Sequence, residues 1–84
     1  MGYRSFIPYS TIVRYLPSII RLGVSERARG QGQFIEQYRR HGTNLPQYWL
    51  DKREAFIART LPEYNRNKTM RRRLSLIAWA YDPR

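Results

Sequence analysis

The residues best suited to chemistry form one basic run, Lys68-Thr69-Met70-Arg71-Arg72-Arg73, at the start of an expected helix. The helix dipole disfavours cations in that position by a few tenths to about 1 kcal/mol each. Free backbone N–H groups at a helix start bind anions, and arginine forks match phosphate oxygens. We therefore expect a phosphate-binding site made by Lys68, Arg71, Arg72 and Arg73. Two alternatives stay open: the arginines pair with Glu63, Glu54 or Asp82, or they remain solvated.

A second basic set surrounds the Gly30-Gln31-Gly32 segment and consists of Arg27, Arg29, Arg39 and Arg40. Two glycines allow a loop to approach a nucleic-acid backbone closely. The segment matches neither the nucleotide-binding P-loop pattern nor the dinucleotide-binding glycine pattern. The alternative is a plain connector. Arg39 and Arg40 would then complement the dipole in the last turn of a helix, with no ligand needed.

Aromatic side chains offer a further means of binding nucleic acid, because a base stacked on an aromatic ring contributes about 1–3 kcal/mol. Trp49, Phe56 and Trp79 are expected in the core, since so short a chain needs its largest side chains there. Tyr48 and Tyr64 are the candidates for exposed stacking contacts.

The residue types give little support for an enzyme active site or a metal site. The chain has no Cys and one His, which excludes zinc fingers, iron–sulfur clusters and thiol catalysis. His41 is expected in a terminal helical turn or on the surface. Asp51 and Glu54 have a spacing that suits a hydrated Mg²⁺, but this spacing is common on solvated helices. We expect a non-enzymatic protein without a cofactor.

The overall charge indicates a polyanionic partner. The 84 residues include 16 Lys+Arg and 6 Asp+Glu, for a net charge of +10. All of the Lys+Arg residues except Lys52 and Lys68 are arginine. A GC-rich codon bias would explain the preference for arginine but not the net charge. So large a charge repels itself in a compact state, and a polyanion relieves that repulsion. With 42% apolar and 14% aromatic residues, the chain is expected to fold as one domain over residues 1–84.

No apolar window is long enough for a transmembrane helix. The first acidic residue is Glu26, and the preceding segment is rich in Arg and Ser, a composition typical of mitochondrial presequences. Pro8 and Pro17 oppose a continuous presequence helix. The same segment also suits an ordinary core element or a basic amphipathic segment on a membrane or partner. We expect an intracellular location in the cytoplasm, nucleoid or virion, with mitochondria as an alternative.

The hydrophobic spacing and the Gly, Pro and Asn positions predict an all-α fold, a small compact bundle of three to four short helices. The expected helices cover residues 10–22, 31–41, 44–60 and 69–81, with a short helical turn at 26–29 and an extended arm within 1–9. The expected caps or boundaries are Ser10, Gly23, Ser25, Gly42, Asn44 and Pro62, and either Asn67 or Thr69 caps the last helix.

Two residues do not fit their expected helices. Pro17 must kink the first helix or start a second one. Arg53 falls within the apolar stripe of the third helix, where a charge must extend to solvent, pair with a carboxylate or face a ligand.

The sequence favours a small module that binds DNA or RNA through phosphates with little base specificity. The segment from Gly23 to Arg59 resembles small basic proteins encoded by phages and other mobile elements, without a motif that assigns residue roles. A ribosome-associated or virion protein also fits. The alternative is an interaction module, such as a viral adaptor, inhibitor or structural subunit. It would dock an acidic protein or a second copy through an apolar surface made by Leu76, Trp79, Ile12, Ile19 and Ile20.

Overall fold

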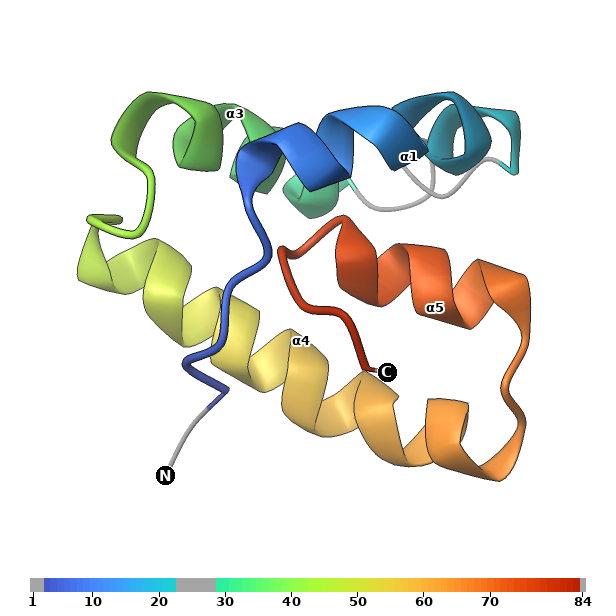
Figure 1. Cartoon of the computed structure of the whole chain (residues 1–84). Coiled ribbons are helices and arrows are strands. Elements are labelled where there is room, and N and C mark those ends of the chain that lie inside the picture. The colour runs from blue at the N-terminus through green and yellow to red at the C-terminus, as the bar shows by residue number, and fades with distance from the viewer. Residues whose placement is uncertain (1–2, 23–28, 84) are drawn as a thin grey trace.

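The computed structural model describes residues 3–22 and 29–83 (Figure 1). In these residues the helices are α1 (Tyr9–Arg21), α3 (Arg29–His41), α4 (Gln47–Arg66) and α5 (Met70–Ile77), and no strand is present. The described part of the chain is therefore a small all-α bundle, and this confirms the expected fold class.

Helix α5 occupies the middle of the bundle, packed against both α1 and α4 (Figure 1). Residues 3–8 form an extended arm that runs from the start of α1 across the first half of α4. The backbone N–H of Ile7 donates to the carbonyl of Ala80 at 3.0 Å, which ties the arm to the segment after α5.

Helix α1 begins one residue before the expected cap. Pro8, with no side-chain hydrogen bond, takes the cap position that was expected for Ser10. Pro17 lies inside the continuous helix and on its exposed side. Because Pro17 has no N–H, the carbonyl of Val13 loses its helical hydrogen bond. Val13 is also on the exposed side, so water can donate to this carbonyl instead. Ile20, which was assigned to an apolar contact surface, is 58% exposed.

Helix α3 begins at Arg29, so the expected break at Gly30-Gln31-Gly32 is wrong and these residues are helical. The expected end at Gly42 is confirmed. Its φ of +60° is accessible to glycine at little cost, and its N–H donates to the Tyr38 carbonyl at 2.8 Å. The predicted helical turn at 26–29 lies mostly outside the described residues.

Helix α4 is longer than expected and continues through Pro62 to Arg66. Its cap position is Pro46 rather than Asn44. The last turns of α4 are stabilised by packing, because they place Leu61 and Tyr64 against the core around Leu76. This packing outweighs the one backbone hydrogen bond that Pro62 removes.

Helix α5 has the expected N-cap, since the Thr69 hydroxyl accepts a hydrogen bond from the Arg72 N–H at 3.2 Å. It ends at Ile77 and not at Tyr81. Ala80 adopts a φ of +63°, which turns the chain out of the helix. The turn inserts the Trp79 ring between Phe34, at 4.8 Å between ring centroids, and Phe56, at 5.2 Å. Stacking of three aromatic rings compensates for the strained backbone.

Leu76 and Trp79 are buried in this core, so the apolar contact surface expected from them is wrong. Ile12 and Ile19, assigned to the same surface, are also buried. Their stripe faces inward because α1 covers α5.

Arg53 holds the arm and the segment after α5 to α4. The residue is 2% exposed, and its guanidinium donates to backbone carbonyls only. The acceptors are Trp79 (2.7 Å), Ala80 (2.9 Å), Ser5 (2.8 Å) and Tyr3. Burial lowers the pKa of Arg53 to about 10, so the group stays charged at neutral pH. Of the outcomes expected for this residue, extension to solvent and pairing with a carboxylate are therefore wrong.

Candidate nucleic-acid interface

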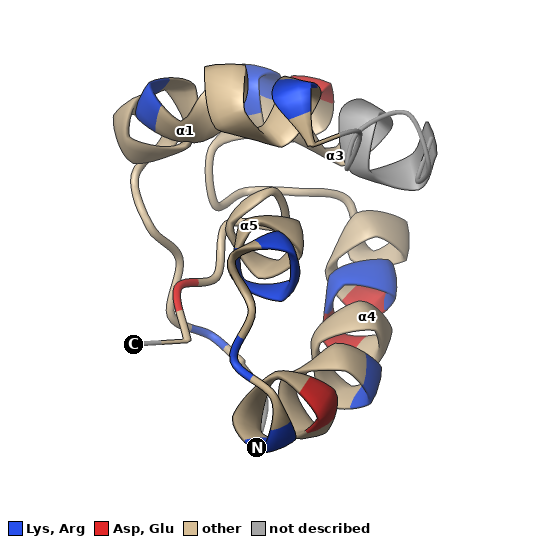
Figure 2. Cartoon of the chain, turned by 90° about the vertical axis from the view of Figure 1, so that its right-hand side faces the viewer, with Lys and Arg blue, Asp and Glu red and all other residues tan. Residues whose placement is uncertain are grey.

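The connection from α4 to α5 carries exposed cations without partners. The side chains of Arg66, Lys68 and Arg71 are exposed and make no hydrogen bond or ion pair within the described chain. Figure 2 shows basic segments in blue along this connection and into the first turn of α5. Arg66 was not among the predicted site residues, although it lies two residues before Lys68 in the sequence. The structure places it in the last turn of α4, next to the connection.

Arg72 is half-buried and remains at the rim of this surface. Its Nη1 donates to the Asn67 carbonyl at 3.3 Å, which fixes the side chain over the connection. We call Arg66, Lys68, Arg71 and Arg72 the basic edge. Glu63, one turn before Arg66, is exposed and has no ion pair among the described residues.

Arg73 does not belong to the basic edge, although it was predicted as a phosphate anchor. Its side chain is 11% exposed and its Nη2 lies 3.4 Å from both the Asp82 carboxylate and the Tyr15 hydroxyl. Burial acts to lower the pKa of Arg73, but the contacts with Asp82 and Tyr15 outweigh it and the pKa is raised. The alternative of internal pairing with Asp82 therefore holds for this arginine.

The backbone at the start of α5 adds hydrogen-bond donors to the basic edge. The first N–H groups of a helix have no acceptor within the helix. The Thr69 hydroxyl and carbonyl accept from Arg72 and Arg73, respectively. In the described structure, the N–H groups of Met70 and Arg71 remain without an acceptor. Two free N–H groups and unpaired cations thus meet at one helix start.

The second predicted basic set lies at a different place. The end of α3 and the start of α5 are on opposite sides of the bundle (Figure 1). Arg39 and Arg40 share the Glu36 carboxylate, at 2.5 Å and 3.2 Å. The hydrogen bond from Arg39 is the main cause of a lowered Glu36 pKa. Arg29 starts α3 but its side chain is not described, and Arg27 lies outside the described residues. The two sets therefore do not form one continuous surface in the described residues.

The two tyrosines predicted to stack on bases differ in exposure. Tyr48 is 62% exposed, with the Lys52 ammonium 5.3 Å from its ring centroid. Tyr64 is 6% exposed and packs on Leu76, so the prediction of an exposed contact is wrong. The error follows from the expected end of the third helix, which left Tyr64 in a loop.

Within residues 3–22 and 29–83, no group of three or more His, Cys, Asp or Glu is placed to hold a metal ion. No helix in the same residues is long and apolar enough to cross a bilayer. Comparisons with protein-family models, curated proteins and solved structures found no match to the chain.

Proposed function

We propose that this protein is a small non-enzymatic module that binds nucleic acid through its phosphates at the basic edge. The observation that carries the proposal is the meeting of Arg66, Lys68 and Arg71, all exposed and unpaired in the described structure, at the start of α5. Arg39 and Arg40 are weaker candidates, because Glu36 already neutralises part of their charge.

An unfavourable arrangement in the free protein supports the proposal. Helix α5 has no acidic residue in its first turn and has Arg71, Arg72 and Arg73 there. The dipole opposes these cations, and no carboxylate compensates for Arg71 among the described residues. A phosphate would accept from the free N–H groups and from the exposed side chains at once. Binding would thus remove a repulsion that the free protein retains.

The first test is the salt dependence of binding. Fluorescence anisotropy with labelled single-stranded and duplex oligonucleotides should give a log–log slope of roughly one unit per contacted phosphate. The triple variant Arg66→Gln/Lys68→Gln/Arg71→Gln should reduce the slope by about 2–3 units and weaken binding by about 100-fold or more at low salt.

A variant with the same loss of charge separates the basic edge from net charge alone. The variant Arg14→Gln/Arg39→Gln/Arg40→Gln also loses three exposed cations, but none from the basic edge. When both variants are compared at about 0.1 M salt, it should bind within about threefold of the wild type, because the screening length there is about 10 Å and more distant charges contribute little. Equal losses in the two variants would contradict the assignment to the basic edge. A flat salt response in the wild type would contradict phosphate binding altogether.

A further inference from the structure

The exposed face of α4 carries a row of cations. Lys52, Arg59 and Arg66 follow one another at intervals of seven residues, and we call them the α4 row. Seven residues make nearly two helical turns, so the three side chains lie on one face of the helix, about 10 Å apart along its axis. All three residues are exposed, and so is Ala55 between the first two. Figure 2 shows basic segments that recur along this helix.

The α4 row has no counter-ion among the described residues. None of its side chains makes a hydrogen bond or an ion pair there. The Lys52 ammonium lies 5.3 Å from the Tyr48 ring centroid, and the Arg59 guanidinium lies 6.0 Å from that of Phe56. An aromatic ring attracts a cation but does not neutralise it. The row therefore keeps its positive charge available to a ligand.

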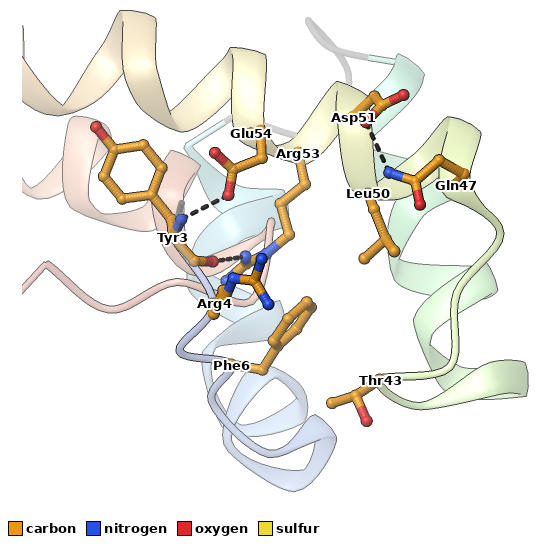
Figure 3. Close-up of a pocket in the computed structure, with 9 residues that line it drawn as sticks. All are labelled: Tyr3, Arg4, Phe6, Thr43, Gln47, Leu50, Asp51, Arg53 and Glu54. Carbon is orange, nitrogen blue, oxygen red and sulfur yellow. Dashed lines mark hydrogen bonds between the residues drawn. The ribbon is translucent and has the colours of Figure 1, made fainter. Parts of the chain in front are cut away.

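The carboxylates of α4 lie to either side of the row. Asp51 accepts from Gln47 Nε2 at 2.8 Å, and Glu54 accepts from the Tyr3 N–H at 2.5 Å (Figure 3). Both carboxylates lie on the side of α4 that lines a cavity of about 620 Å³ next to the arm, and Glu63 is exposed on the opposite flank of the row. A helix in the major groove of a duplex has a phosphate strand along each flank, where α4 has carboxylates. The arrangement therefore suits one phosphate chain better than two.

The α4 row connects an exposed aromatic ring to the basic edge. Tyr48 lies one turn before Lys52 and is 62% exposed, so its ring is accessible to a base. Arg66 belongs to both the row and the basic edge. From Tyr48 to Arg66 the helix rises about 27 Å, at about 1.5 Å per residue. A stacked strand advances about 3.4 Å per nucleotide, so this length corresponds to about eight nucleotides.

We propose that a single-stranded nucleic acid binds along α4, with its phosphates on the α4 row and the basic edge and one unpaired base stacked on Tyr48. This inference rests on the proposed function and adds the class of nucleic acid and the path of the strand. A basic surface that follows the backbone, combined with an aromatic ring for the bases, binds single strands without sequence preference. Bases inside a duplex are paired and stacked, so only a single strand offers one to Tyr48.

The length of the bound strand is the first readout. Fluorescence anisotropy with labelled oligothymidylates should show an affinity for the full chain that rises up to about eight nucleotides and then levels off. Binding at the basic edge alone would level off at about four nucleotides, because its cations reach few phosphates. A duplex should bind at least about threefold more weakly than its single strands, because its bases cannot stack on the ring. Since a duplex has the higher charge per length, this preference would not follow from charge alone.

The variant Lys52→Gln/Arg59→Gln removes the part of the row outside the basic edge. At about 0.1 M salt it should bind a strand of about ten nucleotides about tenfold more weakly than the wild type, and a strand of about four nucleotides equally well. Arg14→Gln/Arg21→Gln is the matched control, with the same loss of charge at exposed sites of α1, which lies on the other side of α5 (Figure 1). This control should bind both strands within about threefold of the wild type.

Tyr48→Ala tests the stacked base. It should weaken binding of the longer strand by about tenfold, while the salt dependence stays as in the wild type, because no charge is removed. Tyr48→Phe keeps the ring and should bind within about twofold of the wild type. No loss in Tyr48→Ala, or an equal loss in both variants, would overturn the proposal.

These outcomes separate the proposal from the proposed function. Salt-dependent binding that levels off at about four nucleotides, that prefers the duplex, or that falls equally in the row variant and its α1 control overturns the path along α4. It leaves phosphate binding at the basic edge intact. A flat salt response overturns the proposed function and this inference with it. Binding that is lost in Lys52→Gln/Arg59→Gln but kept in Lys68→Gln/Arg71→Gln supports the α4 row and contradicts the basic edge.

Discussion

Arg53 shows how far a single residue can depend on parts of the chain that are distant in sequence. The hydrophobic pattern correctly marked it as unusual, because a charge lay within an apolar stripe. Its partners are carbonyls 26 to 50 residues away, and every residue has a carbonyl. No side-chain pattern can therefore identify them. The burial of Tyr64 was not predicted for the same reason, since it follows from tertiary contacts. The pairing of Arg73 with Asp82 was one of the alternatives that the sequence left open.

Arg53→Met keeps the apolar stem of the side chain and removes every donor. Four carbonyls would lose hydrogen bonds to a charged group, and two of those bonds are fully buried. We expect the free energy of unfolding to fall by about 3 kcal/mol or more, measured by urea denaturation. The loss should be constant between about pH 6 and 8, because a pKa near 10 in the folded chain and a higher one when unfolded keep the group charged in both states.

The control for this prediction is Arg59→Met, which removes an exposed arginine from the same helix. Its effect should stay within about 0.5 kcal/mol. If Arg53→Met were no more destabilising than Arg59→Met, the hydrogen bonds to the arm and to the segment after α5 would not hold the fold together.

At the scale of elements, the sequence predicted the number and order of the helices in the described residues but misplaced several boundaries. Thr69 and Gly42 were predicted correctly because a hydroxyl cap and a positive φ are local requirements. Pro62 was wrongly read as a stop, since its local cost is outweighed by packing of Leu61 and Tyr64. Because the last turns of α4 were not predicted, Tyr64 was wrongly expected to be exposed.

Pro62→Ala should stabilise the protein. Pro62 is exposed inside α4, where it leaves the Ala58 carbonyl without its helical donor. Alanine restores that donor and suits a helix interior, so the free energy of unfolding should rise by about 1–3 kcal/mol. Urea denaturation measures the change. Pro46→Ala at the cap position serves as the control and should change stability little, because no helical N–H is required there. A loss of stability in Pro62→Ala would show that the proline stiffens a turn that alanine cannot hold.

At the scale of the whole molecule, composition alone indicated a folded, strongly basic protein, and the all-α architecture agrees with the helical spacing. How the charges are distributed could not be predicted. Exposed cations lie on α1, α3, α4 and the start of α5, and carboxylates pair with only some of them in the described residues. The free protein therefore retains much of its electrostatic repulsion.

Added salt should consequently stabilise the free protein. Raising NaCl from about 20 to 300 mM shortens the screening length from about 20 Å to below 10 Å, and the melting temperature should increase. The variant Arg14→Gln/Arg39→Gln/Arg40→Gln, which carries three fewer positive charges, should show a smaller increase. A melting temperature that is independent of salt would mean that the positive charges are already compensated within the fold.

The acceptors of Arg53 have a consequence for the order in which the protein can form during translation. Tyr3 and Ser5 leave the ribosome early, whereas Trp79 and Ala80 are added more than seventy residues later. Until then the guanidinium has only half of its acceptors, and the Ile7 N–H lacks its own. Final assembly of this protein must therefore wait until that late segment has been synthesised, and a nascent chain stalled before it would present an unanchored arm to chaperones and proteases.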